Sequence, residues 1–150
     1  MPDPLPALAI QFLTEDPEAA FPWEARLGAL GRRLLREEGV HATAVNVVLC
    51  SDATIRRLNR DYRHHDKVTD VLSFEFHEPG FLGEVYICGG QVRRQAPAYG
   101  NTFYAELKRV MVHGLLHLLG YDHIKPADRV KMRKRECEVL KINYYQDSNG

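Results

Sequence analysis

The sequence lacks the features that mark several large classes of protein. Its 150 residues contain no apolar run of the length that crosses a membrane, so we expect no membrane partner. Lys+Arg and Asp+Glu are balanced at 20 each, and the overall charge therefore neither favours nor excludes a polyanionic partner. The first residues, MPDPLPALAIQFL, lack the basic segment and long apolar stretch of a signal peptide. We therefore expect a soluble, cytoplasmic protein.

Cysteine is scarce. Cys50, Cys88 and Cys137 form no C-x-x-C pair and are odd in number, which argues against a disulfide framework. We expect three reduced, half-buried thiols. The sequence also has no internal repeat and no low-complexity segment, and its length suits one domain, 1–150, with its own core.

Histidine, in contrast, is concentrated in one segment, VHGLLHLLGYDH (112–123). On a helix, His113 and His117 lie one turn apart on the same face. Gly120 can end that helix, after which the chain can bring His123 toward the pair. The spacing matches the long zinc-protease motif H-E-x-x-H-x-x-G-x-x-H. The segment therefore predicts one Zn²⁺ per chain, bound by three imidazoles with a fourth position open, as in catalytic sites.

One position departs from that motif, because Gly114 stands where the protease has its general-base glutamate. Zinc can lower the pKa of bound water to about 7 without an adjacent carboxylate. A peptidase must also protonate a poor amine leaving group, for which the glutamate is most useful. Gly114 thus argues against a protease mechanism and is tolerable in a phosphodiesterase. Asp70, Glu84 and Asp122 remain alternative bases.

Periodicity and capping residues predict the secondary structure. Ser51 and Thr102 can each cap a helix, and the helix after Thr102 is apolar on more than one stripe, so it should be central and mostly buried. Strands come early and helices cluster late, which indicates an α+β fold with a small mixed sheet packed with about five helices. Strands are expected at 7–13, 42–50, 69–76 and 83–88, and helices at 22–38, 51–62, 91–97, 102–119 and 126–140.

A basic cluster, NRDYRHHDKVTDVLSF (59–74), precedes the third strand. Such runs are usually solvated surface. Arginine, however, binds phosphate through a planar fork and keeps its charge, which makes Arg63 a candidate for phosphoryl chemistry. The sequence alone does not place Arg63 near His113. We expect a positively charged groove around the metal, with candidate side chains Arg60, Arg63, Lys67, Lys125, Arg129 and Lys131.

Several short motifs, in a fixed order, resemble the YbeY family of bacterial rRNA-maturation endoribonucleases. The resemblance is dense between Leu58 and His123, and the N-terminal third contributes little to it. The motifs are LNRDYR (58–63), TDVLSFEF (69–76), LGEVYIC (82–88), QA (95–96) and VHGLLHLLGYDH (112–123).

This resemblance implies a zinc-dependent, single-strand-specific endoribonuclease that acts in 3′-end maturation of the small-subunit rRNA and in ribosome quality control. It implies the metal ligands His113, His117 and His123 and a functional arginine at Arg63. The expected partners are single-stranded RNA, the small-subunit rRNA and ribosome-associated proteins, with no DNA. Arg60 and Lys67 are further candidates for RNA binding.

Glu75 departs from the family pattern, which usually has proline after LSF, and this departure bears on the local loop shape and the groove rim. Two other functions stay open. A zinc peptidase of unusual design would need a carboxylate from elsewhere in the chain. A non-catalytic ribosome assembly factor would use the metal only to stabilise its fold.

Overall fold

The computed structural model describes residues 8–16 and 18–142. Residue 7 of the first expected strand and the tail QDSNG lie outside these residues. The structure confirms the predicted four strands and five helices and their order, and their bounds differ from the predicted ones by a few residues. They are β1 (Ala9–Thr14), α1 (Glu24–Glu37), β2 (Ala44–Cys50), α2 (Asp52–Arg63), β3 (Val71–Glu78), β4 (Phe81–Cys88), α3 (Gly89–Gln95), the 3-10 turn η1 (Ala96–Tyr99), α4 (Phe103–Leu118) and α5 (Pro126–Leu140).

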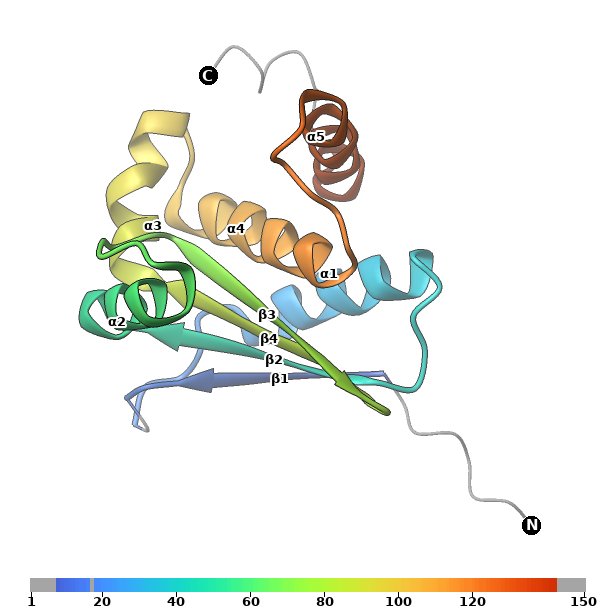
Figure 1. The fold of residues 1–150 in the computed structure, drawn as a ribbon, viewed down its shortest axis with the longest axis horizontal. Helices are drawn as coiled ribbons and strands as arrows, with labels where there is room; N and C mark the ends of the chain where they lie inside the picture. Colours follow the sequence, from blue (N-terminus) through green and yellow to red (C-terminus); the bar gives the residue numbers. More distant parts are fainter. Residues whose placement is uncertain (1–7, 17, 143–150) are drawn as a thin grey trace.

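The four strands form one mixed sheet in the order β1-β2-β4-β3. β1 and β4 each pair with β2 in parallel, and β3 pairs antiparallel with β4, which leaves β3 at an edge. α4 packs on one face of β3 and β4, with α1 and α5 against it, and α2 packs on β3 and β4 from the other face (Figure 1). This arrangement confirms the α+β prediction.

The metal-motif helix, α4, is central, as its sequence predicts. Its first turn is capped by Thr102, whose hydroxyl accepts a hydrogen bond from the Ala105 amide at 3.1 Å. It stops because Gly120 adopts a left-handed conformation with φ of 95°. Between these ends, α4 buries side chains on more than one stripe: Glu106, Leu107, Val110, Met111, Val112, Leu115, Leu116 and Leu118.

α1 begins two residues later than expected. Trp23, predicted inside this helix, has φ of 54° and lies just before it. Its ring packs against Tyr104 at 4.9 Å and Phe103 at 5.8 Å between centroids. The aromatic contact with α4 therefore accompanies a backbone conformation that the local pattern could not predict.

The three cysteines are free, as expected, and they are more deeply buried than expected. Burial raises the pKa of the Cys50 thiol to about 12, so this thiol stays neutral. No helix in the described residues combines the length and the apolar character that crossing a membrane requires.

Candidate metal centre

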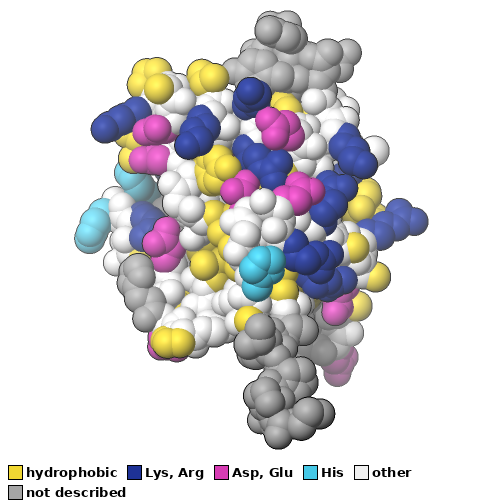
Figure 2. Space-filling view, turned by 90° about the vertical axis from the view of Figure 1, so that its right-hand side faces the viewer, with side chains coloured by type: hydrophobic (Ala, Val, Ile, Leu, Met, Phe, Trp, Pro, Cys, Tyr) yellow, Lys and Arg dark blue, Asp and Glu magenta, His cyan; other side chains and the backbone are white. Residues whose placement is uncertain are grey.

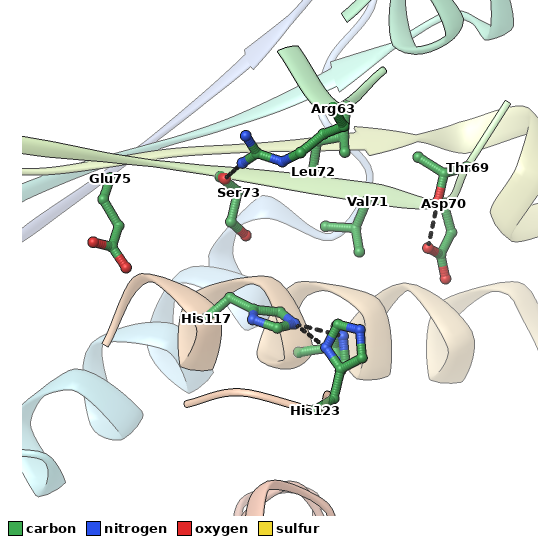
Figure 3. A pocket seen from close by; sticks show the side chains of 10 residues that line it. Arg63, Thr69, Asp70, Val71, Leu72, Ser73, Glu75, His117 and His123 are labelled. Carbon is green, nitrogen blue, oxygen red and sulfur yellow. Dashed lines mark hydrogen bonds between the residues drawn. The ribbon is translucent and has the colours of Figure 1, made fainter. Parts of the chain in front are cut away.

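Three histidines converge at the C-terminal half of α4. His117 Nε2 lies 3.1 Å from His113 Nε2 and 2.9 Å from His123 Nδ1. One nitrogen from each ring falls within 4.8 Å of the others. Figure 3 shows His123, which follows the Gly120 turn, directed back at His117 on the helix. The three side chains are therefore positioned to bind a metal ion.

Glu136 of α5 holds one of these rings. Its Oε1 lies 2.5 Å from Nδ1 of His113, and its Oε2 accepts a hydrogen bond from Arg133 at 3.1 Å. Burial acts to raise the pKa of Glu136, but the His113 hydrogen bond and the Arg133 charge outweigh it and lower that pKa. An ionised Glu136 can only accept a hydrogen bond, so it favours the His113 tautomer with the proton on Nδ1, which leaves the Nε2 lone pair for the site, as in carboxylate–histidine–metal arrangements.

The sequence analysis missed Glu136. A signal for it was present, because Glu136 follows the apolar Met132 by four residues and so shares its helix face. An acidic residue on the buried face of a helix usually has a specific partner.

Exchange of Glu136 for glutamine is expected to weaken metal binding about 10–100-fold, because the new side chain would present a neutral amide in place of the carboxylate that orients His113. Competition with a chelator measures this affinity. Glu138→Gln, on the exposed side of α5, is the matched control and should bind metal normally. Equal affinities in both variants would contradict an orienting role for Glu136.

The surroundings of the His117 ring favour its neutral form. Burial is the largest effect that lowers its pKa, to about 4, and the neighbouring His113 and His123 lower it further. A neutral ring is the form that binds a metal ion. The donor set of three imidazoles therefore fits zinc, and it also fits other divalent transition metals.

At Gly114, α4 packs tightly against side chains of the sheet. A Cβ atom there would lie 2.5 Å from Val85 Cγ1 and 3.0 Å from Val71 Cγ2. The Ser73 hydroxyl also donates a hydrogen bond to the Gly114 carbonyl at 2.8 Å. A glutamate at this position would have to displace the side chains of Val85 and Val71. The glycine is therefore a packing requirement as well as a departure from protease chemistry.

Replacement of Gly114 by alanine is expected to destabilise the fold by about 1–3 kcal/mol, because overpacking outweighs the gain in helix propensity. Urea denaturation measures the loss. Gly28→Ala is a suitable control, since the Cβ there would meet mainly the flexible end of Arg32 at 3.0 Å and the Phe12 ring at 3.3 Å. A Gly114→Ala protein as stable as the Gly28→Ala protein would show that the side chains of Val85 and Val71 move aside at little cost in stability.

The histidines open into a hollow of about 560 Å³ between α4 and the edge strand β3. We call it the metal hollow. Side chains of β3 form one wall, and Arg63 reaches over that wall from the end of α2 (Figure 3). Its lining residues are Arg63, Thr69, Asp70, Val71, Leu72, Ser73, Glu75, His113, His117 and His123.

Arg63 is held at the rim by its contacts with β3. Its Nη2 donates to the Ser73 carbonyl at 2.8 Å, and its guanidinium lies 4.9 Å from the Phe74 ring centroid. Asp66 pairs with Arg56 at 2.8 Å instead. Within the described ranges, Arg63 has no carboxylate partner, and its charge is thus available to a ligand.

The other predicted basic residues do not join Arg63. Arg60 pairs with Asp61 at 3.0 Å, and neither Arg60 nor Lys67 lines the metal hollow. Lys131 lines a different hollow, together with Asp122 and other residues. Figure 2 shows Lys and Arg interspersed with Asp and Glu on the face it presents. RNA binding by Arg60 and Lys67 stays a prediction.

Of the candidate bases, Asp70 alone lines the metal hollow, and Glu75, which was not considered as a base, lines it too. Asp70 is held by Gln95, whose amide donates to Asp70 at 2.9 Å and to the buried Glu106 at 2.7 Å. Asp122 accepts a hydrogen bond from the Ile124 amide at 3.0 Å. Glu84 belongs to a hollow on the opposite face of the sheet.

The sequence matches the model of one known family. A family model described as "Endoribonuclease YbeY" matches residues 12–143. The chain belongs to the YbeY endoribonuclease family. The match includes the N-terminal third, to which the short motifs contributed little. It confirms the family resemblance drawn from the motifs.

Curated YbeY relatives align over most of the chain. The Chlorobium phaeovibrioides endoribonuclease YbeY is 38% identical over 120 residues, which cover 79% of this chain and 81% of the relative. That of Anaeromyxobacter dehalogenans is 38% identical over 138 residues, covering 89% and 71%. A solution structure of TM1509 from Thermotoga maritima is 34% identical with a TM-score of 0.60, covering 88% of this chain and 89% of that one. The family model and these relatives thus establish the YbeY family, and the solved structure has a similar fold.

Proposed function

We propose that this chain is a zinc-dependent endoribonuclease specific for single-stranded RNA, with one zinc ion held by His113, His117 and His123. The observation that carries the proposal is the convergence of three imidazole nitrogens within 4.8 Å beside Arg63 in one hollow. Membership of the YbeY family supports cleavage of RNA phosphodiester bonds.

A zinc ion held by the three histidines would supply Lewis-acid activation of a water molecule and of a phosphoryl oxygen. The chain's own residues then divide the remaining work. Glu136 keeps His113 in the tautomer whose Nε2 faces the site. Arg63 binds a non-bridging oxygen of the scissile phosphate and stabilises the charge that develops there. Asp70 and Glu75 are the carboxylates in the hollow able to accept the proton of the attacking group.

The substrate and setting follow from the family resemblance. We propose that single-stranded segments of the small-subunit rRNA reach the hollow in the cytoplasm, during 3′-end maturation and ribosome quality control, and that ribosome-associated proteins are partners. The peptidase alternative lacks its glutamate, and the packing around Gly114 leaves no room for that side chain.

Metal-loaded protein incubated with a single-stranded RNA and with the duplex of the same sequence tests the proposal. Only the single strand should be cut, with cleavage lost to a chelator and restored by zinc. A His117→Ala protein, purified identically, controls for contaminating nuclease. Protection of the RNA without cutting would favour the assembly-factor alternative, and chelator-sensitive peptide turnover would favour the peptidase.

A further inference from the structure

A second hollow, of about 170 Å³, lies on the opposite side of strand β3 from the metal hollow. We call it the aromatic hollow. It opens between α2 and the strands β3 and β4, and rings form most of its lining. The lining residues are Leu58, Tyr62, Phe74, Phe76, Glu84 and Tyr86.

Aromatic surface is exposed here rather than covered. The Tyr62 residue is 62% exposed and Phe76 is 39% exposed. The rings of Tyr62 and Tyr86 each meet Phe74 edge-on, with centroids 5.4 and 5.7 Å away. Exposed apolar side chains grouped in a concave place indicate a binding site more strongly than the same side chains scattered singly.

The aromatic hollow and the metal hollow are both lined by residues of the edge strand β3. Alternation along β3 directs Ser73 and Glu75 into the metal hollow and Phe74 and Phe76 into the aromatic hollow. β3 has no further strand beside it in the described sheet. Arg63 spans this edge, because it lines the metal hollow while its guanidinium lies over the Phe74 ring. A chain molecule bound at Arg63 can therefore reach both hollows.

The polar group in the aromatic hollow indicates which part of such a molecule enters. Glu84 accepts hydrogen bonds from Tyr86 at 3.3 Å and from Asn46 at 3.4 Å. A carboxylate has about four acceptor sites, so Glu84 can accept a further hydrogen bond. Its negative charge repels a phosphate, but it can accept a hydrogen bond from the exocyclic amino group of a base.

We propose that the aromatic hollow is a nucleobase subsite, which holds one base of single-stranded RNA beside the phosphate at Arg63 and prefers a base with an exocyclic amino group. This inference rests on the proposed function. Stacking on aromatic rings is the usual way in which proteins hold unpaired bases. Strand β3 would then separate a base-binding side from a cleavage side, with Arg63 between them.

Binding of a short single-stranded RNA to the metal-free protein, followed by fluorescence anisotropy, tests the subsite without cleavage. Tyr62→Ala and Phe76→Ala should each weaken binding about tenfold, which corresponds to about 1.4 kcal/mol. Tyr99→Ala is the matched control, because Tyr99 is 47% exposed and contacts Arg109 rather than the hollow. Thermal melting should show all three variants folded.

An RNA with one abasic nucleotide next to the cleaved bond identifies the occupant. The abasic RNA should bind the wild-type protein as weakly as the intact RNA binds the Tyr62→Ala protein. Binding of the abasic RNA to Tyr62→Ala should show no further loss of affinity. A preference for cytosine over uracil at that nucleotide should disappear in Glu84→Gln. These results would support the subsite.

Unchanged RNA affinity in Tyr62→Ala and Phe76→Ala, with cleavage intact, would overturn the subsite and leave the proposed function standing. The subsite would also be overturned if these two variants lost binding to a ribosomal protein while their RNA affinity stayed unchanged. The hollow would then be a protein-docking site. RNA bound through these rings by a metal-loaded protein that never cuts it would overturn the proposed function and leave the subsite.

Discussion

Replacement of His113 by alanine is expected to abolish RNA cleavage and metal binding together. Two imidazoles would remain, and the buried carboxylate of Glu136 would lose the ring that it orients. Metal assistance supplies several kcal/mol of transition-state stabilisation, so its loss should lower the single-turnover rate by more than about a hundredfold. Metal content measured by mass spectrometry should fall in the same preparation.

A matched exchange at an exposed histidine provides the control. His41 follows α1 and does not line the metal hollow, so His41→Ala should keep both metal and activity. Addition of excess zinc distinguishes weakened zinc binding from slower cleavage by a zinc-loaded site. Excess zinc should restore part of the His113→Ala rate only if the two remaining histidines still bind the ion. A His113→Ala protein with one equivalent of metal and full activity would exclude His113 as a ligand.

The parts of this site that the sequence predicts are those set by local geometry. A separation of four residues places His113 and His117 on one helix face in any α-helix. Gly120 adopts the left-handed conformation that the pattern requires, and this brings His123 back toward the pair. The caps of α2 and α4 were predictable for the same reason, since a cap depends on three or four neighbouring residues.

The parts that were missed depend on contacts between distant segments. Glu136 reaches His113 only because α5 packs against α4, and no local pattern encodes that placement. The need for glycine at position 114 comes from its close approach to Val71 of β3 and Val85 of β4. The left-handed Trp23 likewise accompanies packing against α4.

The basic cluster combines both cases. Residue type made Arg63 a candidate for phosphoryl chemistry and the family resemblance supported it, but charge and residue type do not reveal which partners Arg60, Arg63 and Lys67 have. In the structure, Arg60 has Asp61 as its partner, whereas Arg63 folds over β3 to the metal hollow. Distinguishing these arginines requires the position of a strand that follows them in the sequence.

Exchange of Arg63 for alanine should lower the cleavage rate about a hundredfold while metal content stays normal. The physical reason is that one charged donor aimed at the scissile phosphate is worth about 3 kcal/mol of transition-state stabilisation. Arg63→Lys should restore only part of the rate, since an ammonium keeps the charge but loses the planar fork. Single-turnover cleavage with metal-loaded protein measures both effects.

A purely structural role for Arg63 makes a different prediction. Its contacts within the described residues are to backbone carbonyls and to the Phe74 ring, so loss of these contacts would lower stability and reduce every activity in proportion. Arg56→Ala is the control, because it removes the exposed pair with Asp66 from the same helix and should leave cleavage unchanged. Thermal melting beside the kinetics decides between the two roles. A folded, metal-loaded Arg63→Ala protein that cuts RNA at the wild-type rate would remove this arginine from the mechanism, whereas a slow protein with unchanged melting would place its charge at the phosphate.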